Sequence, residues 1–232
     1  MSPNFTPTAR RFGIVSAVRV VVLQVVYAGT LTAGFVSLDT PDQPIGDPMF
    51  TILEVLILAM MPAMVALMVA VHAWAPAQAK TFSLTAVVFM GLLAGVTSSL
   101  HFVILTLSRQ PEFTELTELP LFLRFEWPSV AYALDILAWD VFFPLSMLFA
   151  APVFGGSRLA SSIRILMITS GLLAFAGLGG VITGNMSLRN VGIVGYLGVF
   201  LIVAVLLAIV FYRTNPNDES PDDSSQPLNH VA

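Results

Sequence analysis

Apolar residues dominate six stretches of the chain, and short polar segments separate them. Each stretch is close to the roughly 20 residues with which a helix crosses the hydrocarbon core of a bilayer. Strands are excluded, because the runs are too long for barrel strands and lipid-exposed backbone must satisfy its hydrogen bonds internally. The pattern therefore predicts an all-α integral membrane protein, a six-transmembrane-helix bundle. Its spans are expected at about 12–36, 49–71, 82–108, 128–151, 163–184 and 190–212.

The predicted spans form one domain, with a polar segment at each end of the chain and one long loop between spans. Residues 1–11 are a short leader, and residues 12–213 form one transmembrane domain. Residues 214–232 are acidic and lack apolar periodicity, so we expect a disordered tail. The longest loop, 109–127, alternates Glu, Leu and Phe and is expected to form a short interfacial helix.

The distribution of basic residues among the loops predicts the orientation. With six spans both termini lie on one side, and Lys and Arg in short loops favour the cytoplasm. The side with the termini carries Arg10, Arg11, Lys80, Arg158, Arg164 and Arg213. The other side carries Arg109, Arg124 and Arg189. We therefore expect a multi-pass protein of the cell membrane with both termini in the cytoplasm.

Composition narrows the function classes. Only 10% of the residues are charged, against about 25% in soluble domains, so the lipid bilayer is the expected surrounding. Cysteine is absent, which excludes a disulfide framework and a cysteine nucleophile. No basic patch points to nucleic acid, and no phosphate- or dinucleotide-binding motif points to a cofactor. Lys80 is the only lysine and lies in a loop, which excludes a retinal Schiff base within the bundle.

The fourth predicted span carries two carboxylates, Asp135 and Asp140, between Trp127-Pro128 and Pro144. Ionisable residues are costly inside a bilayer and are functional candidates by default. By a rise of about 1.5 Å per residue, Asp135 lies roughly 10 Å below the outer boundary.

Two further ionisable residues are expected at the same depth on other helices. Glu54 lies about 9 Å below the outer boundary on the second span, and His101 about 12 Å below it on the third. Asp135, Glu54 and His101 are therefore the candidates for acid–base or proton-exchange chemistry. The competing interpretation is an internal hydrogen-bond network that fixes helix packing. No H-x-x-H or E-x-x-H spacing supports a metal, and we predict none.

Asp140 is expected to have a different partner from Asp135. Five residues correspond to about 140° around a helix of 3.6 residues per turn, so the two aspartates should not share a face. Arg19, on the first span, reaches about the same inner level as Asp140. We therefore predict a structural Arg19–Asp140 ion pair. Pro144 cannot donate to the carbonyl of residue 140, so a kink is expected there.

Polar and aromatic residues near these acids predict a pocket wall. Tyr132 and Trp139 share a helical stripe with Asp135, Glu126 lies near the expected mouth, and Ser98 lies beside His101. Separately, Gly91 and Gly95 form a small-xxx-small pair that predicts close helix packing.

These features favour the binding or transport of a small apolar or amphipathic molecule in an outer-half pocket. In this interpretation Asp135 and Glu54 recognise a cationic or hydroxyl group or exchange a proton, and His101 tunes their charge. The first alternative is a membrane-embedded enzyme with carboxylate general acid or base chemistry on a lipid or isoprenoid substrate, by analogy with small membrane-integral terpene cyclases. The second alternative is a structural or assembly subunit.

Overall fold

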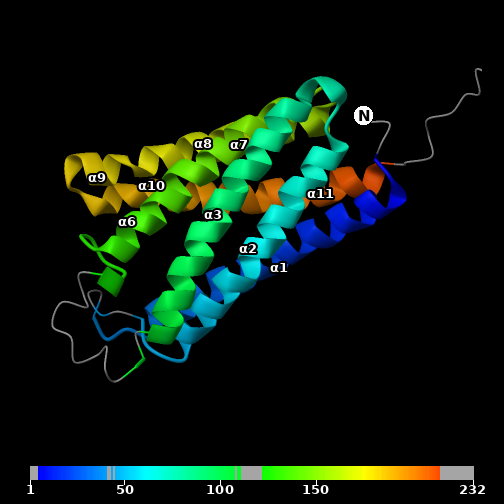
Figure 1. Cartoon of the computed structure of the whole chain (residues 1–232). Helices are drawn as coiled ribbons and strands as arrows, with labels where there is room; N and C mark the ends of the chain where they lie inside the picture. The colour runs from blue at the N-terminus through cyan, green and yellow to red at the C-terminus, as the bar shows by residue number, and fades with distance from the viewer. Residues whose placement is uncertain (1–4, 41–42, 44, 108, 111–121, 215–232) are drawn as a thin grey trace, which may run out of the picture.

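Six long apolar helices make up the computed structural model, which describes residues 5–40, 43, 45–107, 109–110 and 122–214 (Figure 1). The first two spans are α1 (Pro7–Val36) and α2 (Met49–Trp74). The third joins η1 (Ala77–Ala79) to α3 (Lys80–Leu107). The fourth contains α6 (Val130–Ile136), η2 (Leu137–Phe142), α7 (Phe143–Ala150) and η3 (Ala151–Val153). The fifth contains α8 (Arg158–Gly177) and α9 (Gly179–Thr183). The sixth contains η4 (Met186–Arg189), α10 (Asn190–Ile193), η5 (Val194–Val199) and α11 (Phe200–Arg213).

The lengths of these spans agree with the predicted bundle. They run from 24 to 31 residues, and about 20 are needed to cross the hydrocarbon core. Large apolar side chains such as Val22, Phe102 and Ile165 are more than half exposed on the outer surface, as lipid contact requires. The chain is therefore a multi-pass membrane helical bundle. The expected interfacial helix in 109–127 and the expected disorder of the tail fall mostly outside the described residues.

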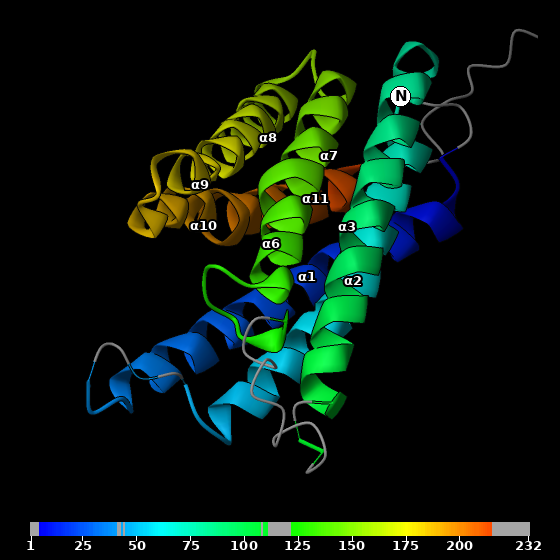
Figure 2. The ribbon, with the colours of Figure 1, turned by 60° about the vertical axis from the view of Figure 1, so that its left-hand side comes forward.

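The spans pack in a ring that follows the order of the chain. The first span contacts the second, the second contacts the third, and the third contacts α7 of the fourth. The fourth span contacts α8, which in turn packs against η5 and α11, and α11 returns to α1. Figures 1 and 2 show the same order from two directions. Both described ends of the chain therefore lie at one end of the bundle, which we call the terminal end, and the opposite end is the far end.

The first helix begins at Pro7 rather than at residue 12. The Thr6 hydroxyl accepts a hydrogen bond from the backbone N–H of Ala9 at 3.1 Å, and proline suits the first turn of a helix. Arg10 and Arg11 consequently belong to the helix. Ser129 and Ser157 cap the fourth and fifth spans in the same way.

Two basic side chains hold helix ends together at the terminal end. Arg10 donates hydrogen bonds to the carbonyls of Phe211 and Tyr212, and Lys80 donates to those of His72 and Ala73. Cations are favoured there, because the last carbonyls of a helix are unpaired and carry partial negative charge.

A polar contact closes the start of the second span at the far end. Asp47 accepts hydrogen bonds from the hydroxyl and the backbone N–H of Thr51 and pairs with Arg109 at 3.2 Å. The Thr51 hydroxyl, with Arg109 nearby, holds the pKa of the Asp47 carboxyl below its usual value.

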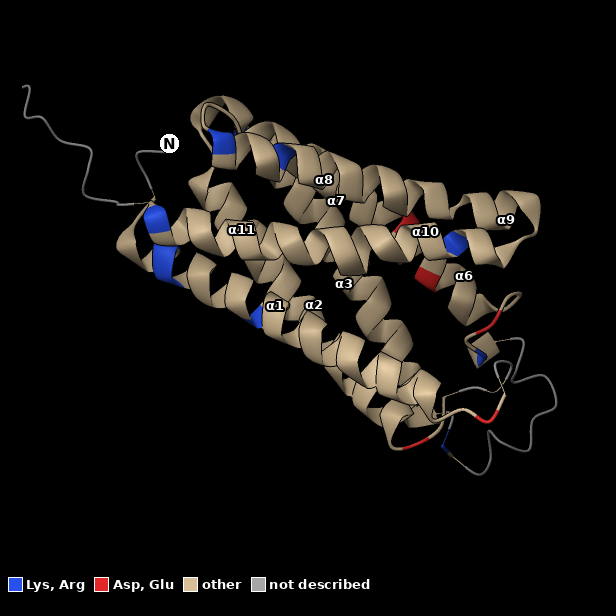
Figure 3. Cartoon of the chain, turned by 180° about the vertical axis from the view of Figure 1, so that it is seen from behind, with Lys and Arg blue, Asp and Glu red and all other residues tan. Residues whose placement is uncertain are grey.

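The apolar core fills the terminal half of the bundle. It is rich in methionine, whose flexible side chain fills irregular gaps. The fully buried members are Met61, Met64, Met68, Met90, Met147 and Met167. Among the described residues, the buried ionisable side chains are Glu54, His101, Asp135, Asp140 and Arg189. Figure 3 shows acidic and basic positions on the ribbon around α6 and α10, in the far half of the bundle. The bundle therefore has an apolar layer and a polar layer.

Candidate functional site: a buried polar cluster in the far half of the bundle

Arg189 binds two carboxylates of the fourth span at once. Its Nη2 donates to Asp135 Oδ2 at 2.5 Å, and its Nε donates to Asp140 Oδ2 at 3.0 Å. All three side chains are buried, with 5%, 6% and 0% exposed surface for Arg189, Asp135 and Asp140. The rigid fork of a guanidinium suits such double contacts, which a single ammonium cannot make in the same way.

The two aspartates share a partner because η2 is a π-helical segment. Its hydrogen bonds run over five residues, as in the bond from the Phe143 N–H to the Ala138 carbonyl. Residues five apart therefore come close together, whereas an α-helix separates them by about 140°. The prediction of separate faces is thus wrong for Asp135 and Asp140. Pro144, which follows directly, marks this irregularity in the sequence because it cannot donate to the carbonyl of residue 140.

Asp140 has a different partner from the one predicted. Its cation is Arg189, and Arg19 is exposed on the outer surface of α1. The predicted Arg19–Asp140 ion pair is therefore wrong, because Arg19 faces outward from the bundle. A long arginine on a lipid-facing surface can extend toward the aqueous boundary.

His101 connects the second span to the fourth. Its Nδ1 lies 2.8 Å from Glu54 Oε2, and its Nε2 lies 4.0 Å from Asp135 Oδ1. His101 and Glu54 are 4% and 6% exposed. The structure therefore brings together the three residues that the sequence placed at one depth. Glu54, His101, Asp135, Arg189 and Asp140 form one continuous set of contacts, which we call the polar cluster.

The polar cluster contains more carboxylates than cations. Three acids face one guanidinium and one imidazole, so the acids exceed the cations by one even when His101 is protonated. Two buried atoms, His101 Nε2 and Asp140 Oδ1, have no hydrogen-bond partner among the described residues. Unpaired buried charge and unsatisfied polar atoms are costly, and such groups mark sites with a further role.

Aromatic rings cover the polar cluster toward the far end. The guanidinium of Arg189 lies over the ring of Tyr132, 4.4 Å from its centre. Phe125 contacts both His101 and Tyr132, with ring centres 5.5 and 5.6 Å apart. Tyr132, which the sequence assigned to the pocket wall, is half-buried in this position.

A second aromatic group borders the polar cluster toward the apolar core. Trp139 lies between the two aspartates on the fourth span, and its ring centre is 4.9 Å from that of Tyr196. Gln24 donates to the Tyr196 carbonyl at 3.0 Å, which ties the first span to η5. Tyr27, one turn further along α1, is close enough to interact electrostatically with Asp135 and Glu54. Trp139, also assigned to the wall, is thus next to the cluster.

Two other predicted wall residues have different surroundings. Glu126 is exposed and pairs with Arg124 at 2.7 Å, so its carboxylate lies outside the buried polar cluster. Ser98 is half-buried on α3. Its neighbour Thr97 is fully buried, and the Thr97 hydroxyl has no hydrogen-bond partner among the described residues.

Glycines allow the fifth and sixth spans to approach Asp140. A Cβ added at Gly177 or Gly192 would lie 3.1 or 3.0 Å from Asp140 Oδ1. In contrast, Gly91 and Gly95 are exposed, and a Cβ added there would meet nothing within 4 Å. Among the described residues, the predicted close packing is therefore not found at Gly91 and Gly95, whereas Gly177 and Gly192 pack closely around Asp140.

Arg189 is the residue that sequence reasoning missed. The predicted spans left Arg189 in the connection before residue 190, whereas it is the last residue of η4, the first turn of the sixth span. Its position could have indicated a role in the membrane, because Arg189 is only one residue from the start of the predicted sixth span. A long side chain there reaches the level of Asp135 from the far boundary.

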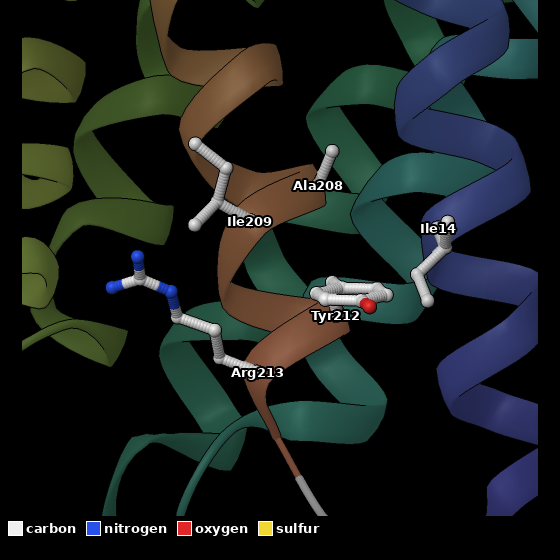
Figure 4. A pocket seen from close by; sticks show the side chains of 5 residues that line it. All are labelled: Ile14, Ala208, Ile209, Tyr212 and Arg213. Carbon is white, nitrogen blue, oxygen red and sulfur yellow. The ribbon is translucent and has the colours of Figure 1, made fainter.

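Outside the polar cluster, the described residues form a surface hollow but no metal site. Among the described residues, no group of three or more His, Asp or Glu side chains is arranged to hold a metal ion. A surface hollow of about 440 Å³ lies between α1 and α11 near the terminal end (Figure 4). Its lining consists of Ile14, Ala208, Ile209, Tyr212 and Arg213. None of these residues belongs to the polar cluster.

Comparisons of the chain with protein families, with curated proteins and with solved structures find no match. The fold class therefore rests on the helices themselves, and the function must be argued from the polar cluster.

Proposed function

We propose that the polar cluster binds a small amphipathic molecule with a cationic or hydroxyl group, and that the protein binds or transports this molecule in the membrane. The observation that carries the proposal is the convergence of Glu54, His101, Asp135, Asp140 and Arg189 in one buried layer in which carboxylates exceed cations. Intramembrane ionisable groups normally face a substrate or ion pathway.

The charge of the layer selects the ligand. Because carboxylates exceed cations in this layer, it favours a ligand with a positive charge or a hydroxyl donor. Glu54 and Asp135, the two carboxylates on either side of His101, carry this negative charge. An anionic ligand would add to the excess and is disfavoured.

The aromatic rings select for size and apolar character. Phe125 and Tyr132 on one side and Trp139 and Tyr196 on the other provide flat apolar walls, and aromatic faces also attract cations. Basic residues at the terminal end favour a cytoplasmic location for that end. The proposed site then lies in the outer half of the membrane, between Tyr132 and Trp139.

A membrane-embedded enzyme on a lipid or isoprenoid substrate is the second candidate. His101 contacts both Glu54 and Phe125, so a carboxylate lies near the aromatic rings of Phe125 and Tyr132. Arg189 weakens this candidate. A catalytic carboxylate must reach its substrate, whereas the guanidinium of Arg189 occupies one oxygen of Asp135 and one oxygen of Asp140.

The test compares ligands that share one carbon skeleton and differ only in charge. An aryl-alkyl amine, the corresponding alcohol and the corresponding carboxylic acid are added to the purified protein in lipid nanodiscs, and thermal stability is measured. We expect the amine to stabilise most and the acid least. Glu54→Gln should remove the preference for the amine, whereas Glu126→Gln, which changes an exposed acid, should retain it. Equal stabilisation by all three compounds in the wild-type protein would contradict the proposal.

A further inference from the structure

We infer that His101 carries a proton that a cationic ligand displaces, so that the binding of one cation releases one proton. This inference rests on the proposed function and adds a coupling ion to it. The observation behind it is that His101 lies between two carboxylates from different spans and that one of its nitrogens has no hydrogen-bond partner.

The positions of the two carboxylates around His101 suit a protonated imidazole. Nδ1 contacts Glu54 Oε2 at 2.8 Å, and Nε2 points to Asp135 Oδ1 at 4.0 Å. A neutral imidazole that donates from Nδ1 would direct a lone pair from Nε2 toward a carboxylate oxygen. A protonated ring directs an N–H to each acid, and a small movement of the side chain closes the longer contact to an ordinary hydrogen bond.

The surroundings of His101 are acidic on balance. The ionisable groups that face it or its partners come from all the neighbouring spans: Tyr27, Glu54, Tyr132, Asp135, Asp140, Arg189 and Tyr196. Arg189 is the one fixed cation in this group, and it is bound to Asp135 Oδ2 and Asp140 Oδ2. The other oxygen of Asp135, Oδ1, faces His101. A mobile positive charge is therefore required near Oδ1.

A proton on His101 and a positive charge on the ligand are alternatives. Both would lie against Asp135 Oδ1 in a layer shielded from water, where like charges repel strongly. When the cation binds, the proton leaves the imidazole for water, and His101 remains hydrogen-bonded to Glu54. The net charge of the layer is unchanged by the exchange, because one positive charge replaces another. No bond other than the N–H bond is broken.

The exchange makes ligand affinity depend on pH with a fixed slope. In the range where His101 is protonated before binding and neutral afterwards, affinity should fall about tenfold for each unit by which the pH is lowered, since one proton is released per cation. A proton gradient across the membrane would then drive or oppose movement of the cation.

The experiment uses benzyltrimethylammonium, whose charge does not titrate, so that any proton released comes from the protein. Binding is measured in lipid nanodiscs, and proton release is followed with a pH-indicator dye in weak buffer. In parallel, ¹⁵N-histidine NMR reads the charge of each imidazole. The chain has three histidines, and His101→Gln and His72→Gln assign the signals. His72 is the matched control, because it is hydrogen-bonded to Ser83 near the terminal end.

We expect one proton released per cation, an imidazolium signal for His101 that becomes neutral on binding, and normal behaviour of His72→Gln. Binding without proton release would overturn the exchange and leave the proposed function standing. Absence of binding at every pH would overturn both. A neutral His101 in the ligand-free wild-type protein at pH 6 would overturn the exchange. Its signal can also be assigned by elimination with His72→Gln and His230→Gln, so poor folding of His101→Gln does not affect the decision.

Discussion

Arg189 Nε donates a hydrogen bond to Asp140 Oδ2 at 3.0 Å, and this contact joins the start of the sixth span to the middle of the fourth. Both side chains are buried, and the same guanidinium also holds Asp135. Loss of Arg189 would therefore leave two buried carboxylates without their cation.

Arg189→Met should destabilise the protein strongly. Removal of one partner from a buried ion pair costs about 3–5 kcal/mol. The measurement is unfolding by SDS in mixed micelles, followed by circular dichroism. Arg124→Met is the matched control, because Arg124 pairs with Glu126 on the exposed surface, where an ion pair contributes about 0–1 kcal/mol. Similar losses in both variants would contradict the central position of Arg189.

The π-helical segment makes a separate prediction about Asp135 and Asp140. Because both bind one guanidinium, the effects of Asp135→Asn and Asp140→Asn on unfolding should not add. Residues that share a partner show interaction energies of about 0.5–3 kcal/mol in a double-mutant cycle. The cycle of Asp135→Asn with Asp47→Asn is the control, since Asp47 pairs instead with Arg109. Additivity of the first cycle would show that the two aspartates act independently.

Sequence reasoning reached the fold because the signal was repeated along the whole chain. Six apolar runs of membrane-spanning length leave few alternatives to a helical bundle, and the bounds differ from the structure mainly where caps such as Thr6 extend a helix. It also placed Glu54, His101 and Asp135 at one depth, because depth depends only on the rise per residue.

The same reasoning failed where direction around the helix mattered. An assumed 3.6 residues per turn separated Asp135 from Asp140, and the π-helical turn before Pro144 reversed that result. Arg19 was chosen as the partner of Asp140 by its level alone, and only the packing of the spans shows that Arg189 is the partner. Periodicity does not specify which face of one helix meets another, so the partner of Asp140 required the structure.

Glycine substitutions should distinguish the contacts around Asp140 from the exposed face of α3. An alanine at Gly192 would bring its Cβ to 3.0 Å from Asp140 Oδ1, and overpacking of this kind costs about 1–3 kcal/mol. Gly91→Ala adds a methyl group in open space and should be neutral or slightly stabilising, because alanine favours a helix over glycine by about 1 kcal/mol. Thermal unfolding of the two variants in one detergent makes the comparison. Equal stability of the two would contradict the packing around Asp140.

The absence of cysteine allows a direct test of orientation. Thr40→Cys places an exposed thiol between the first two spans at the far end, and Gln78→Cys places one at the terminal end. If the terminal end is cytoplasmic, a membrane-impermeant maleimide should label Thr40→Cys in intact cells and label Gln78→Cys only after the membrane is opened. The reverse pattern would place the polar cluster in the inner half of the membrane.

The most direct measurement is equilibrium binding of radiolabelled benzyltrimethylammonium to the wild-type protein, Glu54→Gln and Glu126→Gln in nanodiscs. We predict one cation per chain for the wild-type protein and for Glu126→Gln. We expect at least tenfold weaker binding for Glu54→Gln, because that variant removes one negative charge from the buried layer. Binding of equal affinity to all three proteins, or to none, would contradict the claim that the buried acids form a cation site.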